Sequence, residues 1–245
     1  MSSSRPSLPQ TDPPRSPRET LPTMYDLPSD CPEEPGLPDE YHYLQPQLLS
    51  ATLKLSDYTA DQIFSVGDMN LYYDVHHPNR YKRPDWFAVT GVPRLYEEKE
   101  LRLSYVIWQE GVVPAIVVEL LSPGTEKEDL GQTSASDSGI PTKWQVYEQI
   151  LRVPYYVLFN RYNNALQAFQ LVGDRYQPLD VSQQSAYIPT WERQLVIWRG
   201  TYQGVERAWL RWANTDGSLI LTPDERADIL ARRLRDLGVD PDNLQ

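Results

Sequence analysis

The clearest hydrophobic pattern in the chain is Ala115–Leu121 (AIVVELL), a continuous apolar run that a single charge, Glu119, interrupts. Short continuous runs of this kind are typical of strands buried on both faces. Further stretches rich in aromatic and β-branched residues predict strands on either side of it. These stretches are Met69–Val75, Pro84–Val89, Leu103–Trp108, Tyr155–Asn160, Ala165–Val172, Gln194–Trp198 and Ala208–Trp212.

Three segments predict helices. Lys143–Arg152 places its apolar residues at helical spacing and ends before Pro154, which cannot continue a helix. Thr125–Glu128 matches a capping box and opens a short helix. Thr222–Leu237 is amphipathic and closes at Gly238, so it predicts a terminal packing or pairing helix. Strands, then a helix, then paired strands indicate an α/β domain with a mixed β-sheet flanked by helices.

The composition changes sharply along the chain. Residues 1–46 hold eleven of the 22 prolines, together with many Ser, Asp and Glu. Such a segment buries too little apolar surface to offset the entropy of ordering. We therefore expect a disordered tail over 1–40, a folded domain over 41–213, and a C-terminal helix and tail over 214–245. Glu40–Pro46 (EYHYLQP) is interpreted as a tether that packs aromatic rings onto the domain.

The formal charge of −11 at first sight argues against a nucleic-acid ligand, so the charge balance gives that partner weak support. Much of the acid lies in residues 1–46 and 214–245, however, so the central domain is close to neutral. We expect no membrane span, because no run of about eighteen apolar residues is present. A single cysteine, Cys31, excludes an internal disulfide, and no signal-peptide core is present, so a cytoplasmic location is expected.

Glu119 is the most informative residue, because a carboxylate inside a buried strand is costly to desolvate. One interpretation is a structural ion pair with an arginine such as Arg83 or Arg94. The other is a metal ligand or general base at the edge of a sheet. The residue by itself leaves both open.

Asp85 changes that balance. Beside a proline, an aspartate is usually a turn residue. Together with Glu119, however, it predicts two carboxylates from neighbouring strands that converge on one Mg²⁺ or Mn²⁺. Lys143 begins the helix expected to pack on the same sheet, where it would bring a cation to the scissile phosphate, although an exposed surface lysine is the commoner case. Tyr147, one turn later, would share its face.

At this point the sequence resembles a known family. Arg83–Asp85, Val117–Thr125, Lys143–Tyr147 and Val153–Tyr156 are similar to the Uma-two family of endonucleases, which belongs to the restriction-endonuclease-like, PD-(D/E)XK superfamily. The resemblance covers about 60–180. Leu121 stands where the superfamily pattern has its lysine, and Lys143 on the following helix takes that place.

The resemblance implies a nuclease site with defined roles. Asp85, Glu119 and the Leu120 carbonyl would hold Mg²⁺ against a phosphate oxygen of DNA. Lys143 would position the attacking water and stabilise negative charge. Asp68 falls where relatives often have an acid, so it is either a peripheral site residue or a plain turn aspartate.

Two other functions remain open. The chain could keep the nuclease fold as an inactive protein-interaction module, which Leu121 and the acidic charge favour. Tryptophans such as Trp198, Trp209 and Trp212 would also suit a sugar-binding protein, although no secretion signal supports it. A homodimer is compatible with cutting two DNA strands, but the sequence does not require one.

Overall fold

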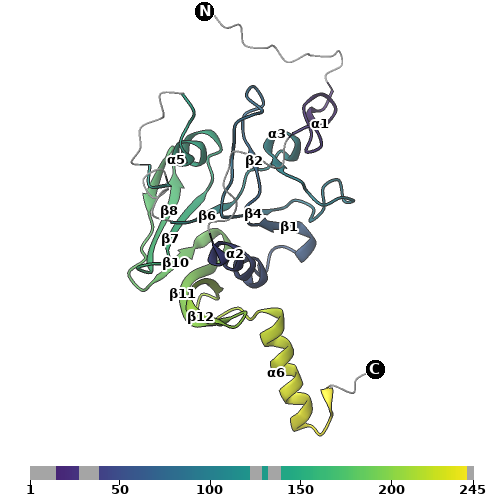
Figure 1. Ribbon diagram of the computed structural model, residues 1–245, viewed down its shortest axis with the longest axis vertical. Helices are drawn as coiled ribbons and strands as arrows, with labels where there is room; N and C mark the ends of the chain where they lie inside the picture. Colours follow the sequence, from purple (N-terminus) through teal and green to yellow (C-terminus); the bar gives the residue numbers. More distant parts are fainter. Residues whose placement is uncertain (1–14, 28–38, 122–128, 132–138, 242–245) are drawn as a thin grey trace, which may run out of the picture.

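The structure is a computed structural model that describes residues 15–27, 39–121, 129–131 and 139–241. Its elements follow one another along the chain as shown in Figure 1. They are α1 (Pro17–Thr20), α2 (Glu40–Thr52), η1 (Ala60–Gln62), β1 (Ile63–Val66), β2 (Leu71–Tyr72), β3 (Tyr81–Lys82), β4 (Trp86–Thr90), β5 (Tyr105–Val106), α3 (Ile107–Glu110), β6 (Ile116–Leu120), α5 (Lys143–Gln145), the π-helix η2 (Val146–Ile150), β7 (Tyr155–Asn160), β8 (Ala165–Val172), β9 (Arg175–Pro178), β10 (Ser185–Ile188), η3 (Pro189–Trp191), β11 (Arg193–Tyr202), β12 (Val205–Ala213) and α6 (Pro223–Asp236).

The central element is a six-stranded mixed sheet with the strand order β1-β4-β6-β7-β8-β9. The β6 and β7 strands are parallel, and the other neighbours in this sheet are antiparallel. All five residues of β6 are buried, as its apolar run predicts. The parallel pair requires a crossover, and α5 and η2 lie on that connection. The predicted α/β class with a mixed sheet is therefore confirmed.

Two hydrophobic cores lie on opposite faces of this sheet. On one face α2 and the antiparallel sheet β10-β11-β12 cover Trp86, Val118 and Val157. On the other face η2 and the short sheet β3-β2-β5 cover Phe87, Val117 and Leu158. Strand residues alternate between the two faces, so neighbours in sequence belong to different cores.

The segment that we interpreted as a tether is instead part of a helix. Residues 40–52 form α2, which begins at the cap residue Asp39 and contains Pro46. Its buried residues lie on one broad side, which packs between the large sheet and β12, and Glu40, Tyr43 and Gln47 lie on the other side. The buried side includes the polar His42 and Gln45, and the outer side includes the aromatic Tyr43, so the sequence does not show the pattern of an amphipathic helix.

Part of the expected disordered tail also has contacts with the domain. Met24 and Leu27 are buried in a small core with Tyr72 and Val106. The indole N–H of Trp108 donates to the Pro22 carbonyl oxygen at 3.0 Å. Residues 15–27 therefore differ from the composition-based expectation, while 1–14 and 28–38 lie outside the described residues.

Two other predicted strands are longer than the strands in the structure. Only Leu71–Tyr72 and Tyr105–Val106 pair as strands within the two longer runs expected around them. The helix expected to open at Thr125–Glu128 lies outside the described residues. Among those described, no helix is both long and apolar enough to cross a bilayer.

Candidate active site

The two predicted carboxylates lie on the same face of the sheet because of strand register. Trp86 on β4 pairs with Val118 on β6 in an antiparallel ladder, so the next residues, Asp85 and Glu119, are neighbours. Phe87 and Val117 belong to the core under η2, and alternation sends the side chains of Asp85 and Glu119 to that same face.

The carboxylates are joined through backbone groups. The Asp85 N–H donates to Glu119 Oε2 at 3.3 Å, and the Leu120 N–H donates to Asp85 Oδ2 at 2.6 Å. Glu119 is completely buried. Each carboxylate therefore accepts a hydrogen bond from the backbone of the segment that carries the other carboxylate. The pairing of β4 with β6 sets the distance between the two carboxylates.

Lys143 and Tyr147 approach Glu119 from the helix above. The Lys143 ammonium lies 3.0 Å from Glu119 Oε2, and the Tyr147 hydroxyl donates to Oε1 at 2.9 Å. Thr142 caps the helix through a reciprocal bond with Gln145, which fixes the position of Lys143 in the first turn. The predicted shared face is confirmed, and the helix continues as a π-helix, a form often found at functional sites.

Asp129 completes the cluster, and the sequence analysis missed it. Its Oδ1 atom lies 3.1 Å from the Lys143 ammonium, and its side chain is buried. The Tyr156 hydroxyl donates to the Asp129 carbonyl oxygen at 3.0 Å and holds that residue against β7. Asp129 follows a polar stretch with no periodic pattern, so only its spacing before Lys143 could have drawn attention to it.

The local charge is dominated by burial and by three acids around one cation. Burial raises the pKa of the Glu119 carboxyl to about 8, while the Lys143 ammonium opposes that shift and Asp85 adds to it. Burial lowers the pKa of Lys143, but the charges of Glu119, Asp129 and Asp85 outweigh it and raise the pKa. Lys143 therefore stays a cation.

Two carboxylates and a strand carbonyl suit a hard divalent cation. Mg²⁺ commonly takes one or two protein carboxylates and completes its octahedron with water and phosphate oxygens. Among the described residues, no three His, Cys, Asp or Glu side chains form a metal-binding group. Oxygen donors of this kind match the ligands of Mg²⁺ better than the Cys and His ligands of a structural zinc site.

The Leu120 carbonyl has a neighbour that the sequence did not indicate. His42 on α2 places its Nε2 atom 3.3 Å from this oxygen and its Nδ1 atom 3.0 Å from Asp39 Oδ1. Because the His42 side chain is buried, α2 is fixed against the end of β6 that carries Glu119.

The other candidate residues lie outside this cluster. Arg83 forms an ion pair with Asp68, which has a left-handed backbone with φ of 53° and so acts as a turn residue. Arg94 lies 5.7 Å from the centre of the Phe64 ring. The ion-pair partner of Glu119 is therefore Lys143 and not an arginine.

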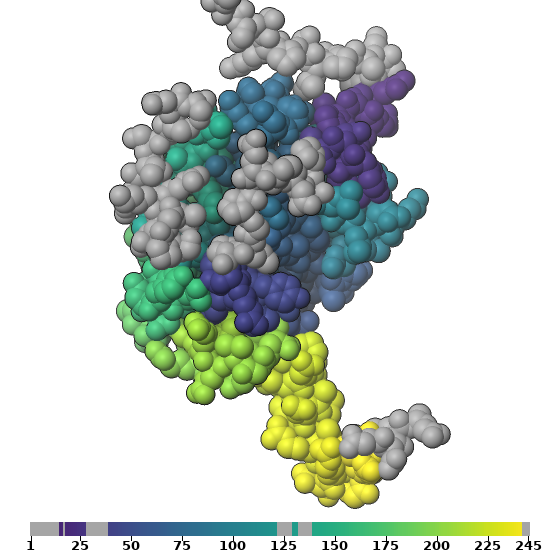
Figure 2. Space-filling model, viewed as in Figure 1, coloured from purple at the N-terminus to yellow at the C-terminus, as the bar shows by residue number. Residues whose placement is uncertain are grey.

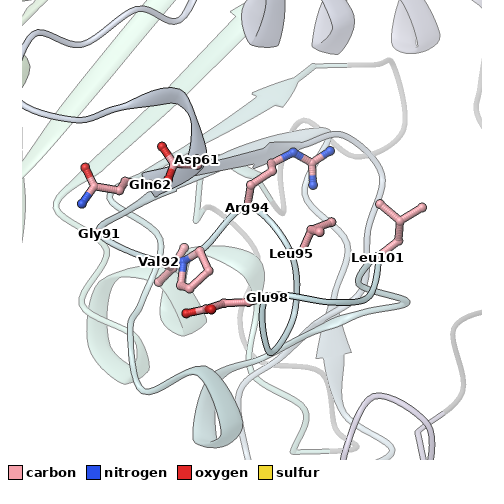
Figure 3. A pocket seen from close by; sticks show the side chains of 9 residues that line it. Asp61, Gln62, Gly91, Val92, Arg94, Leu95, Glu98 and Leu101 are labelled. Carbon is pink, nitrogen blue, oxygen red and sulfur yellow. The ribbon is translucent and has the colours of Figure 1, made fainter.

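A cavity of about 830 Å³ lies at the other end of β4. Its lining residues include Asp61, Gln62, Arg94, Leu95 and Glu98 (Figure 3), and the Arg94 N–H donates to the Asp61 carbonyl oxygen at 2.7 Å. It begins at Gly91, which follows β4, whereas Asp85 precedes that strand. The carboxylate cluster and this cavity are therefore separate features.

The Tyr147 hydroxyl gives a first test of the network. Replacing Tyr147 with phenylalanine removes one hydrogen bond to a buried carboxylate, so we expect it to lower the free energy of unfolding by about 1–3 kcal/mol. Urea unfolding measures this loss. The half-exposed Tyr187, changed to phenylalanine, serves as the control and should change stability little. Equal losses in both variants would contradict a role for the bond.

Comparison with known proteins gives three findings. No curated protein matches the chain. One solved structure, of a protein described as a putative nuclease belonging to DUF820 from Anabaena variabilis, is 14% identical; the match covers 75% of this chain and 86% of that chain, with a TM-score of 0.41. The Uma2 family, described as "Putative restriction endonuclease", matches residues 23–194. That range is most of the chain and includes the whole carboxylate cluster, and the chain therefore belongs to the Uma2 family.

Proposed function

We propose that this protein is a Mg²⁺-dependent endonuclease that hydrolyses phosphodiester bonds of DNA. One observation supports it most directly. The neighbouring carboxylates of Asp85 and Glu119 share a sheet face with the Lys143 ammonium, which lies 3.0 Å from Glu119. Membership of a family described as "Putative restriction endonuclease" supports DNA as the substrate.

Each residue has a distinct part in this proposal. Asp85 and Glu119, with the Leu120 carbonyl, would hold Mg²⁺, which when bound polarises a phosphate and lowers the pKa of a bound water. Lys143 supplies a cation that orients the attacking water and stabilises negative charge on the phosphate. Tyr147 and Asp129 act as positioning residues, because they contact Glu119 and Lys143 respectively.

The test is nicking of supercoiled DNA with and without Mg²⁺. We expect Asp85→Asn to reduce cleavage to the level seen with a chelator, because asparagine can still accept the Leu120 N–H but carries no charge. Asp57→Asn changes an exposed aspartate in the same way and should leave cleavage unchanged. Cleavage that survives in Asp85→Asn, or that needs no metal, would refute the proposed site.

A second function has one specific observation in its favour. Glu119 already has Lys143, Tyr147 and the Asp85 N–H as partners, which is also how a purely structural ion-pair network would be built. The chain would then be an inactive member of the family that serves as an interaction module. Calorimetric titration with Mg²⁺ separates the two functions, since the module should bind no metal at this cluster.

A further inference from the structure

The terminal helix α6 is separated from the body of the protein. Figures 1 and 2 show it projecting from the end of β12, in yellow, away from both cores. None of its fourteen residues is buried. Leu230 is 53% exposed and Leu237 is 78% exposed, although both belong to the apolar stripe of an amphipathic helix. This stripe, formed by Ala227, Leu230, Ala231, Leu234 and Leu237, therefore lacks a partner within the described part of the chain.

The base of α6 is fixed rather than loose. The buried Arg211 on β12 donates to Glu225 Oε1 at 2.9 Å and to the Ile220 carbonyl oxygen at 2.8 Å. Thr222 caps the helix through Glu225. Because Glu225 takes part in both the cap and the ion pair, the apolar stripe is held in one direction relative to the body.

The charges of α6 are divided along its length. The first half is net negative and the second half is net positive, and this separation suits the helix dipole. The residues are Asp224, Glu225, Arg226 and Asp228 in the first half, and Arg232, Arg233, Arg235 and Asp236 in the second. An antiparallel copy of the same helix would place each acidic half beside a basic half.

We propose that α6 is a dimerisation arm that pairs antiparallel with α6 of a second copy of this chain. The shape of the stripe supports a two-fold axis near Leu230. Ala227 lies three residues before Leu230 and Leu234 four residues after it, so the pairing sets small alanines against large leucines. Such a contact is self-complementary, as a two-fold interface requires.

The flanks of the stripe determine how the pairing responds to charge. Helical spacing puts Asp224 and Arg235 on one flank of the stripe. In the antiparallel pair, Asp224 of one copy would lie beside Arg235 of the other copy. Arg226 and Arg233 share the other flank, where they would face one another as like charges. Arg232 lies on the opposite side of the helix and would contact neither.

The expected association is weak. A fourteen-residue helix is about 21 Å long, so the pair buries less than the roughly 1,000 Å² typical of a stable interface. The dissociation constant should then be on the order of 10 μM. Sedimentation equilibrium of the full chain, without metal or DNA, measures it independently of nuclease activity.

Three variants test the arrangement. Leu230→Asp should abolish the dimer while leaving the fold intact, because this side chain is half exposed in the monomer. Arg233→Glu should tighten the dimer by roughly threefold to tenfold, since it replaces a like-charge contact with Arg226 by an opposite-charge pair in both copies. Arg232→Glu is its matched control and should change the dissociation constant less than twofold, on the order of experimental error.

Several outcomes would overturn the proposal. One is a monomer for both the wild type and Arg233→Glu at about 100 μM, well above the expected constant. Another is an equal effect of Arg232→Glu and Arg233→Glu, which would show a response to total charge only. A dimer that persists in Leu230→Asp would place the contact elsewhere on the molecule.

Discussion

Replacing Glu119 with glutamine is expected to reduce Mg²⁺-dependent DNA cleavage to background and to raise the melting temperature of the metal-free protein. Glutamine keeps the shape and can still accept the Tyr147 hydroxyl, but it removes one ligand charge from the proposed Mg²⁺ site. Stability rises because three acids surround one cation, and Lys143 still has Asp129 at 3.1 Å. We expect a gain on the order of 2 kcal/mol.

The stability gain should depend on pH in a defined way. The ordinary pKa of a glutamate is 4.5, and the buried Glu119 has a pKa of about 8. At pH values below 4.5 the carboxyl is protonated in the folded and the unfolded chain, so the variant has no advantage. As the pH rises from 4.5 to about 8, the unfolded chain loses the proton that the folded chain keeps, so the wild type is destabilised relative to the variant.

Calorimetric melts at several pH values, in the presence of a chelator, measure this gain. Glu206→Gln, at an exposed position on β12, provides the matched control and should melt like the wild type at every pH. A variant that loses cleavage but melts at the same temperature as the wild type across this range would show that Glu119 is fully compensated in the apo protein.

Local sequence patterns were sufficient to predict β4 and β6, which position Asp85 and Glu119, and β7 and β8 beside them. β7 and β8 have the bounds expected from Tyr155–Asn160 and Ala165–Val172, because their runs are apolar and end at turn residues. The charge inside an apolar run marked Glu119 as costly, and helical spacing placed Tyr147 on the face of Lys143. These signals are local, so a single sequence contains them.

What the sequence could not predict depends on tertiary contacts. The buried side of α2 includes the polar His42 and Gln45, so its sequence shows no amphipathic stripe, and the helix contains Pro46, a residue that helix interiors disfavour. Asp129 meets Lys143 through a tertiary contact, which the sequence between them does not indicate. His42 reaches the Leu120 carbonyl across 78 residues of sequence. The spacing of apolar residues along the chain does not reveal contacts between residues that are far apart in the sequence.

Replacing Lys143 with methionine is expected to lower the free energy of unfolding by about 3–5 kcal/mol. Methionine retains most of the apolar stem, so packing changes little, but the ammonium between Glu119 and Asp129 is lost. Two buried acids then have no cation, and each must either remain charged at a high cost or take up a proton. Urea unfolding at pH 7 measures the loss, with the exposed Lys54→Met as control.

The double variant K143M/E119Q distinguishes loss of charge balance from loss of packing. If the cost comes from uncompensated acids, Glu119→Gln should stabilise the Lys143→Met protein by about 1 kcal/mol or more beyond the gain of about 2 kcal/mol that it gives the wild type. The loss should also shrink at pH 5, because Glu119 and Asp129 can then take up protons more readily. Strictly additive effects, unchanged between pH 7 and pH 5, would instead mean that the loss does not arise from the charges of Glu119 and Asp129. The carboxylates would then not depend on its charge, and the proposed catalytic role of the ammonium would lose its structural basis.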